Sequence, residues 1–275
     1  MFIKNRFIQT DDNETICYQY FYARKKETLV FIHGVGGCAG VWQPYIEALI
    51  ENYNILTMDL RGHGLSSRPK HFEQYQISHF IKDALQVIQK ENIQDCYLVG
   101  HSLGAMVCLG VTSQIPDRIR GMIILGIGDQ PTFPLLNITS KPYVNRTLQI
   151  IMRYLPRWHR SSHREYSQFK HTKHFSISRF TSDLTHTSLK SYAMSMLAAS
   201  RFDAMEFNHS KIKNCLIIAA QNDVLFDVDS ALCLHRYLLG SQCVFIKKAE
   251  HHFIVTHPKS ILENMMKFSP IEPST

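Results

Sequence analysis

The sequence of 275 residues contains no long apolar segment and no stretch of low complexity. Its longest apolar runs, at residues 121–127 and 215–220, are far shorter than the ~20 residues that a helix needs to span a bilayer. The first residues become polar by residues 9–13 and do not form the apolar stretch of a secretory signal. These absences predict a cytoplasmic protein without a transmembrane segment.

The seven cysteines include no CxxC pair, and their odd number and wide spacing do not fit a disulfide framework or a zinc site. Several lie inside apolar runs, so we expect reduced thiols in the core. No HExxH motif is present, and few carboxylates lie near the histidines of residues 141–190. We therefore expect no metal ion and no cofactor. These histidines are His159, His163, His171, His174 and His186.

Short β-rich runs alternate with longer segments of helical periodicity along the chain. This alternation predicts an α/β fold with a mostly parallel sheet of about eight strands, flanked by helices. The expected strands are residues 2–9, 15–22, 28–32, 54–58, 95–99, 121–125, 215–219 and 243–246. The expected helices are residues 41–50, 78–91, 103–114, 228–239 and 258–268.

Residues 129–208 interrupt the alternation, because they contain no apolar run of the strand type. Between Lys141 and Lys190 there are ten Lys or Arg and two acidic residues, a surplus of eight that accounts for the whole formal net charge of +7. We expect residues 129–208 to form a mostly helical cap on an α/β core made of residues 1–128 and 209–275.

The basic cap allows two interpretations. If it covers the site, its charge would favour an anionic substrate, whereas a solvated basic face is the alternative. Binding of nucleic acid is not expected, because the charge lies in a segment without a recognisable nucleic-acid reading motif.

A GxSxG motif, Gly100-His101-Ser102-Leu103-Gly104, follows one predicted strand and begins a predicted helix. In this context the motif is typical of a nucleophile elbow, in which the serine occupies a strained turn. Both flanking residues must be small, because a Cβ there would collide with neighbouring backbone. The motif therefore indicates Ser102 as a nucleophile, and a glycine-flanked serine in an ordinary tight turn is the alternative.

A second glycine-rich turn, HGVGG at residues 33–37, follows the apolar run 28–32. Such a turn frees backbone N–H groups to point at one spot, as the stabilisation of an oxyanion requires. We expect the N–H groups of Val35 and Leu103 to be the two donors. A phosphate-binding loop is the alternative, but both GxGxxG and the GK[ST] ending are absent.

An orienting acid is expected just after a strand, because reactive groups gather at the carboxyl edge of a parallel sheet. Asp223 follows the strand 215–219, and Asp129 is the alternative after the strand 121–125. Asp227 and Asp229 also lie nearby, but at the start of a predicted helix, where carboxylates commonly cap free N–H groups.

The base is expected in the loop after the last strand, where His251 and His252 are adjacent. Either imidazole could accept the Ser102 proton through one ring nitrogen while the acid holds the other ring N–H. The resulting order along the chain is Ser, Asp, His.

Together these motifs resemble the α/β-hydrolase fold family. The resemblance extends from about residue 28 to residue 268 and includes the DLRGHGLS loop at residues 59–66. In the family a histidine typically precedes a proline by seven residues. Pro258 is seven residues after His251, so this spacing indicates His251 over His252. Glu250 stands at a position where the family often has Gly. The family's DxRGxGxS turn is mainly structural, which implies a scaffold role for Arg61 and His63.

The resemblance implies a carboxylic ester hydrolase with the triad Ser102, Asp223 and His251. Serine at the elbow argues against haloalkane dehalogenases and epoxide hydrolases, and the chain is most similar to small carboxylesterases and enol-lactonase-like hydrolases. The expected substrate is a small acyl compound, an ester, lactone or thioester. The residues expected to contact it are Gly34, His101 and Trp158. A small-molecule receptor, or an acyltransferase that uses the same triad, is the alternative.

Overall fold

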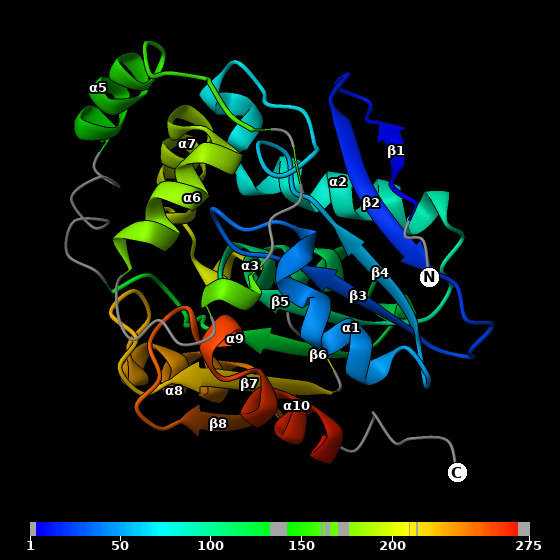
Figure 1. The fold of residues 1–275 in the computed structure, drawn as a ribbon. Coiled ribbons are helices and arrows are strands. Elements are labelled where there is room, and N and C mark those ends of the chain that lie inside the picture. Colours follow the sequence, from blue (N-terminus) through cyan, green and yellow to red (C-terminus); the bar gives the residue numbers. More distant parts are fainter. Residues whose placement is uncertain are drawn as a thin grey trace.

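In the computed structural model, one sheet carries the fold and helices cover both of its faces (Figure 1). The structure describes residues 4–132, 142–160, 162, 166–169, 176–208, 210–212 and 214–268. Within these residues the sheet has eight strands in the order β1-β2-β4-β3-β5-β6-β7-β8, which confirms the predicted fold class. The strands are β1 (Arg6–Gln9), β2 (Thr15–Phe21), β3 (Thr28–Ile32), β4 (Asn54–Met58), β5 (Cys96–His101), β6 (Ile119–Leu125), β7 (Cys215–Ala220) and β8 (Gln242–Ile246).

The strands from β4 to β8 in this order run parallel, whereas β1 and β2 form an antiparallel edge. All residues of β3 and β4 are buried, because a parallel sheet is covered on both faces. Val30 and Ile32 belong to one core cluster, and Leu29 and Phe31 belong to the other. Alternate side chains of one strand therefore supply two separate hydrophobic layers.

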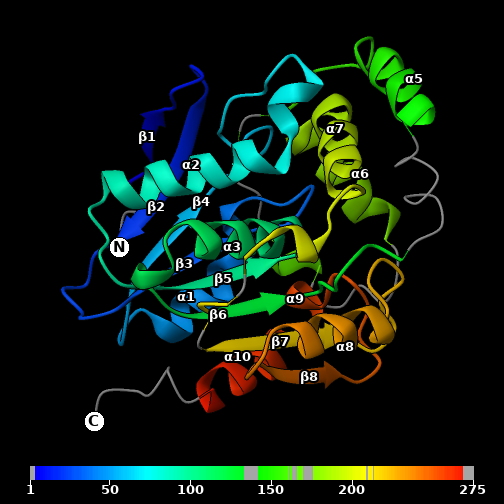
Figure 2. The same cartoon turned by 180° about the vertical axis from the view of Figure 1, so that it is seen from behind.

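The helices form two layers, one on each face of the sheet (Figures 1 and 2). All five predicted helices are present, with ends within two residues of the expected positions. No helix in the described part of the chain is long and apolar enough to cross a membrane. One layer contains α2 (Ile77–Lys90), α3 (Leu103–Gln114) and α8 (Val228–Tyr237), and the other contains α1 (Gln43–Leu49), α9 (Phe253–Thr256) and α10 (Pro258–Lys267).

Three further helices lie between β6 and β7 in the sequence and beyond the carboxyl ends of the parallel strands (Figure 1). They are α5 (Pro142–Met152), α6 (Ile177–Thr187) and α7 (Leu189–Ala199). Helix α7 adds Met194 and Leu197 to the core cluster that α2 and α3 share. The division into core and cap at residues 129 and 208 stays a prediction. The short 3-10 helices are η1 (Ala39–Trp42), η2 (Phe72–Tyr75), η3 (Pro116–Arg118), η4 (Ser167–Phe169) and η5 (Ala204–Glu206).

A buried ion pair fixes the loop that follows β4. The Arg61 guanidinium is enclosed and donates to both carboxylate oxygens of Asp83 on α2, at 2.7 Å from Nε and 2.6 Å from Nη2. Its Nη1 donates to Asp12 at 2.8 Å. In the same loop, Asp59 accepts a hydrogen bond from the Ala39 N–H at 2.7 Å. These contacts fit the scaffold role that the family resemblance implied for this loop.

Replacement of Asp83 by Asn should lower the free energy of unfolding by about 3–5 kcal/mol, because the buried Arg61 would lose its fully buried carboxylate partner and keep only the partly exposed Asp12. Asp95→Asn is the matched control: its pair with Arg120 is exposed on both sides, so we expect a loss below about 1 kcal/mol. Urea unfolding followed by circular dichroism measures both variants. Similar small losses in the two variants would contradict this account of the loop.

Candidate active site

Ser102 lies in the turn between β5, which ends at His101, and α3, which begins at Leu103. Its backbone has a φ of 52° and a ψ of −117°. A conformation of this kind costs a residue other than glycine roughly 1–3 kcal/mol, so surrounding contacts must hold it. One such contact is the hydrogen bond from the Ser102 N–H to the Leu125 carbonyl at 2.9 Å. The strained elbow predicted from the motif is therefore present.

The two glycines of the motif are required by the close approach of neighbouring backbone. A Cβ on Gly104 would lie 2.1 Å from the carbonyl oxygen of Ile32, and a Cβ on Gly100 would lie 2.4 Å from the carbonyl oxygen of Gly104. Both distances are far shorter than non-bonded contact permits. This confirms the predicted steric requirement, and it shows that the first turn of α3 packs directly on the end of β3.

The three residues predicted as a triad meet at the carboxyl edge of the sheet. The Ser102 hydroxyl is 3.0 Å from His251 Nε2, and His251 Nδ1 is 2.7 Å from Asp223 Oδ2. With a neutral imidazole, Ser102 donates to Nε2 and the Nδ1–H donates to the carboxylate. All three residues are buried. The chain therefore brings together a hydroxyl, an imidazole and a carboxylate from three separate loops.

The Asp223 carboxylate is held in its ionised form. Its second oxygen, Oδ1, accepts hydrogen bonds from the N–H groups of Leu225 at 2.8 Å and Phe226 at 3.2 Å. Burial works to raise the pKa of Asp223, but the charge of His251 and these hydrogen bonds outweigh it, and the pKa is lowered. An ionised carboxylate at this position fixes the imidazole tautomer.

The competing carboxylates have other partners. Asp129 accepts hydrogen bonds from the Ser230 hydroxyl at 2.7 Å and from the Gln130 N–H at 2.8 Å. Asp227 accepts from the Ser230 N–H at 2.9 Å and so caps α8, as its position in the sequence predicted. The acid that bonds to the histidine is Asp223.

The adjacent histidines differ in position. His251 makes the hydrogen bonds to both Ser102 and Asp223, whereas the half-buried His252 begins the turn into α9. The two rings are 5.5 Å apart at their centroids and nearly perpendicular. Geometry therefore favours His251 as the base, in agreement with its spacing from Pro258.

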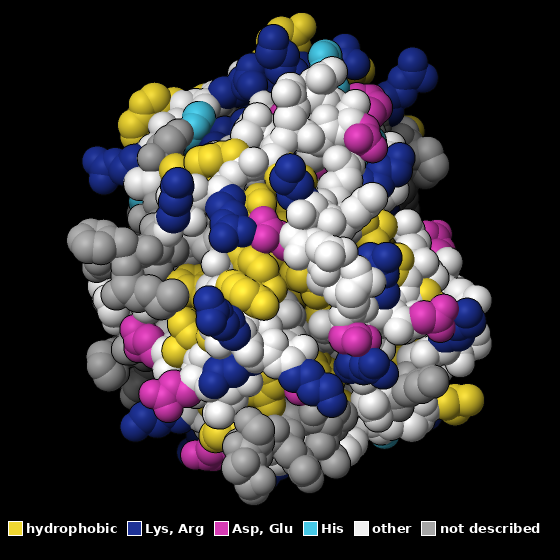
Figure 3. Space-filling model, turned by 90° about the vertical axis from the view of Figure 1, so that its right-hand side faces the viewer, with side chains coloured by type: hydrophobic (Ala, Val, Ile, Leu, Met, Phe, Trp, Pro, Cys, Tyr) yellow, Lys and Arg dark blue, Asp and Glu magenta, His cyan; other side chains and the backbone are white. Residues whose placement is uncertain are grey.

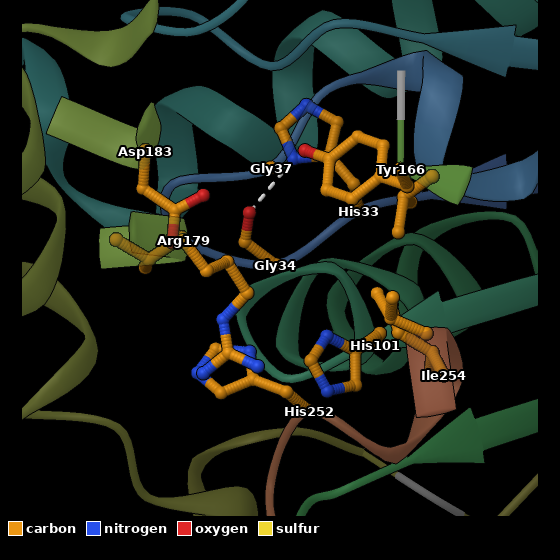
Figure 4. Close-up of a pocket in the computed structure, with 12 residues that line it drawn as sticks. His33, Gly34, Gly37, His101, Tyr166, Arg179, Asp183, His252 and Ile254 are labelled. Carbon is orange, nitrogen blue, oxygen red and sulfur yellow. Dashed lines mark hydrogen bonds between the residues drawn. The ribbon is translucent and has the colours of Figure 1, made fainter. Parts of the chain in front are cut away.

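The candidate oxyanion donors flank the serine. Leu103 is the first residue of α3, where a backbone N–H has no acceptor within the helix. Val35 lies in the turn after β3, and two hydrogen bonds shape this turn: the Gly37 N–H donates to the Gly34 carbonyl at 3.1 Å, and His33 Nδ1 lies 2.8 Å from the same oxygen (Figure 4). The N–H groups of Val35 and Leu103 therefore belong to two elements next to Ser102, the turn after β3 and the first turn of α3.

Helices α6 and α7 reach the same turn. Gly36 has a φ of 76°, in the left-handed region that favours glycine. A Cβ on Gly36 would lie 2.9 Å from Cε2 of Tyr192 on α7 and 3.1 Å from Cβ of Asp183 on α6. The turn that carries Val35 is therefore in close contact with both helices.

A small cavity of about 30 Å³ adjoins the elbow (Figure 4). Gly34 and His101, both predicted to contact substrate, line it together with Tyr166 and the α6 residues Arg179 and Asp183. The cavity is small and partly open, and α6 forms one side of it opposite the elbow.

Trp158, the third predicted substrate contact, is not among the residues that line this cavity, and its side chain is 71% exposed. The structure therefore does not bring Trp158 together with Gly34 and His101.

His101 links the elbow to the histidine loop. Its Nε2–H donates to the His251 carbonyl at 2.9 Å, and the two rings are 5.0 Å apart. Burial, and secondly the charge of His251, lowers the pKa of His101 to about 3. The His101 ring is therefore neutral at neutral pH and holds the backbone of His251 in place.

The sequence analysis did not identify Tyr166, Arg179 or Asp183 as cavity-lining residues. Arg179 and Asp183 are four positions apart, a spacing that places two residues on one face of a helix. That spacing could have marked them as neighbours. Nothing in the local pattern shows that this face of α6 turns toward the elbow.

Within the described residues, no group of three or more His, Cys, Asp or Glu side chains could hold a metal ion. His163, His171 and His174, considered in the sequence as metal ligands, lie outside the described residues. The seven cysteines are free thiols and five are buried, which confirms the expectation of reduced thiols in the core for those five.

Comparisons with known proteins agree with this architecture. The alpha/beta hydrolase fold family matches residues 27–258. The (E)-2-((N-methylformamido)methylene)succinate hydrolase of Acinetobacter baylyi is 33% identical over 121 residues, which are 44% of this chain and 44% of that protein. The match thus spans less than half the length of this relative.

Two solved structures show the same fold over nearly the whole chain. A hydrolase from Pseudomonas aeruginosa has a TM-score of 0.74 and 17% identity, with 97% of this chain and 98% of the other covered. The enol-lactonase from Burkholderia xenovorans has a TM-score of 0.73 and 18% identity, with 96% and 99% covered. From the match over residues 27–258, the eight-stranded sheet and the GxSxG elbow, it follows that the chain belongs to the α/β-hydrolase fold family.

Proposed function

We propose that this protein is a serine hydrolase that cleaves a carboxylic ester, lactone or thioester through an acyl-enzyme on Ser102. The observation that carries the proposal is the pair of hydrogen bonds from Ser102 to His251 and from His251 to Asp223, at 3.0 Å and 2.7 Å. A serine hydroxyl is a weak nucleophile at neutral pH, and an adjacent base that is itself oriented by a carboxylate activates it.

In the proposed mechanism the Ser102 oxygen attacks the acyl carbon while His251 Nε2 takes the hydroxyl proton. The imidazolium is stabilised by the ionised Asp223. It gives the proton to the leaving oxygen or sulfur as the bond from that atom to the acyl carbon breaks, and the acyl group stays on Ser102 as the acyl-enzyme. Water then attacks the acyl carbon with His251 as base, and Ser102 leaves with the proton restored. The proton transfer between Ser102 and His251, and the support of His251 by Asp223, use groups that lie within hydrogen-bond distance in the structure.

The negative charge that develops on the acyl oxygen is proposed to be stabilised by the N–H groups of Val35 and Leu103. The Leu103 N–H belongs to the first turn of α3, where the helix dipole also favours negative charge. Such donors are effective because they are fixed before the reaction begins.

Two other functions use the same residues. A small-molecule receptor would keep the pocket and not turn over, and an acyltransferase would pass the acyl group to an alcohol or thiol in place of water. The names of the relatives, which are a hydrolase and an enol-lactonase, favour hydrolysis.

Replacement of Ser102 by Ala should reduce kcat by a factor on the order of a million and abolish covalent labelling by a fluorophosphonate, because no nucleophile remains. Turnover is measured on a panel of short-chain esters, lactones and thioesters. Retained ester turnover in the Ser102→Ala variant would rule out the mechanism. Labelling of the unmodified protein with negligible turnover on every substrate would instead favour the receptor.

Substitution of each candidate carboxylate tests which of the two, Asp223 or Asp129, orients the histidine. Asp223→Asn should lower kcat by a factor on the order of ten thousand, because the neutral amide no longer stabilises the imidazolium. Asp129→Asn, the same substitution after the neighbouring strand, should leave kcat within a few-fold, since Asp129 bonds to Ser230 and Gln130. The reverse ranking of the two variants would transfer the role of the acid to Asp129.

We propose further that residues 129–208 act as a cap and that α6 selects substrates with an anionic acyl group. Arg179 on α6 is buried, with 4% exposure, and lines the cavity beside the elbow together with His101 and His252 (Figure 4). A guanidinium at this depth can pair with a carboxylate that enters with the substrate, in competition with the Asp183 carboxylate, which lines the same cavity. The Acinetobacter relative is named for a succinate derivative, a dicarboxylate, which supports the same preference.

Arg179→Met should lower kcat/KM for a hemisuccinate ester by roughly tenfold to a hundredfold, as expected for the loss of a charged hydrogen bond of about 1.5–3 kcal/mol. For the neutral butyrate ester of the same alcohol, the change should be smaller than threefold. The ratio of the two kcat/KM values is the measurement. An equal loss on both esters would mean that Arg179 supports the structure of α6 and does not select charge.

A further inference from the structure

The outward face of α5 and of the segment that follows it carries large apolar side chains in contact with solvent. Tyr143 is 69% exposed, Tyr154 is 85% exposed and Trp158 is 71% exposed. Ile150 and Ile151 are each about half exposed. We refer to these five residues, together with the exposed arginines Arg146 and Arg153, as the α5 surface.

The exposure follows from the helical periodicity of α5. Tyr143, Arg146 and Ile150 are spaced three or four positions apart, so they share one face of α5, and Tyr154 lies in the turn directly after the helix. Leu148 and Met152 are half-buried and pack against the core. Because α5 already attaches to the protein through these two residues, its second apolar face is not needed for the fold.

The charge of the same segment has one sign. Residues 141–160 contain five Lys or Arg and no Asp or Glu. By contrast, acidic and basic side chains are interspersed on the side of the molecule that lies at the right of Figure 1 (Figure 3). The α5 surface therefore combines exposed aromatic rings with unbalanced positive charge.

This combination fits the interface of an anionic membrane. Trp and Tyr prefer the level of the lipid headgroups, because their rings are apolar and their tips are polar. Arginines on the same helix attract anionic phospholipids. Helix α5 also projects at one corner of the fold (Figures 1 and 2), so its apolar side chains could enter a lipid interface without a matching groove on the other side.

We propose that the α5 surface binds reversibly to a membrane that contains anionic phospholipid. The aromatic rings lie among the headgroups, and Arg146 and Arg153 pair with lipid phosphates. This association is peripheral and uses no membrane-spanning segment. It is independent of the proposed hydrolase reaction, since none of its residues belongs to the triad or lines the cavity.

The chain offers an intrinsic probe, because it has two tryptophans in opposite environments: Trp42 is fully buried and Trp158 is exposed. On titration with vesicles of phosphatidylcholine and phosphatidylglycerol, we expect a blue shift of the emission and co-sedimentation of the protein. Both signals should weaken with added salt and be nearly absent with phosphatidylcholine alone. Trp158→Phe should abolish the shift while co-sedimentation persists.

Two double variants that lose the same amount of charge test whether the vesicles bind at the α5 surface. Arg146→Gln with Arg153→Gln should weaken binding to the anionic vesicles roughly twenty-five-fold, at about fivefold for each arginine. Lys25→Gln with Lys26→Gln, in the exposed turn before β3, removes the same charge and should leave the affinity nearly unchanged. Circular dichroism and ester turnover show whether each variant is folded.

Four results would overturn the proposal. The first is the absence of binding to anionic vesicles at low ionic strength. The second is an equal loss in the two double variants. The third is co-sedimentation without a change in Trp158 emission. The fourth is a stable dimer in sedimentation experiments with no vesicle binding, which would assign the α5 surface to a contact between two copies of the chain.

Discussion

The contact between the first turn of α3 and the end of β3 determines where the reactive serine lies. Gly104 meets the Ile32 carbonyl at a distance that no side chain would permit. This approach brings Leu103 beside the turn that carries Val35 and forces Ser102 into its strained conformation. The hydrogen bond to Leu125 on the neighbouring strand then holds that conformation. The geometry of the site thus depends on backbone packing between central elements of the sheet.

Much of this could be predicted from the sequence, because the relevant signals are local. Apolar runs such as Thr28–Ile32 predict buried strands, and the positions of Gly100 and Gly104 predict the elbow. The carboxyl ends of parallel strands lie at one edge of the sheet, so Asp223 and His251 could be expected near Ser102 although they are far apart in the chain. The alternation of strands and helices, the GxSxG motif and the family resemblance supported these predictions.

Other features could not be predicted, because they depend on how one element rotates against another. The pattern of residues 129–208 indicates helices but does not show which face of α6 turns inward, and so Arg179 was counted only as part of a basic segment. Trp158 was expected to contact the substrate, but it lies in the exposed segment after α5, and the sequence pattern does not show how this segment is oriented. The choice between Asp223 and Asp129 likewise required the positions of Ser230 and His251.

Helices α6 and α7 pack closely on the turn at Gly36, and this packing couples the entry of a ligand to the position of the Val35 N–H. The cavity beside the elbow is small and α6 lines one side of it, so a bulky ligand would displace α6 from the elbow. This displacement would move Asp183 away from the turn that presents the Val35 N–H. The same displacement would therefore loosen the turn that holds the Val35 N–H, one of the two proposed oxyanion donors. Both donors would be in place only with a ligand that allows α6 to pack against the turn again.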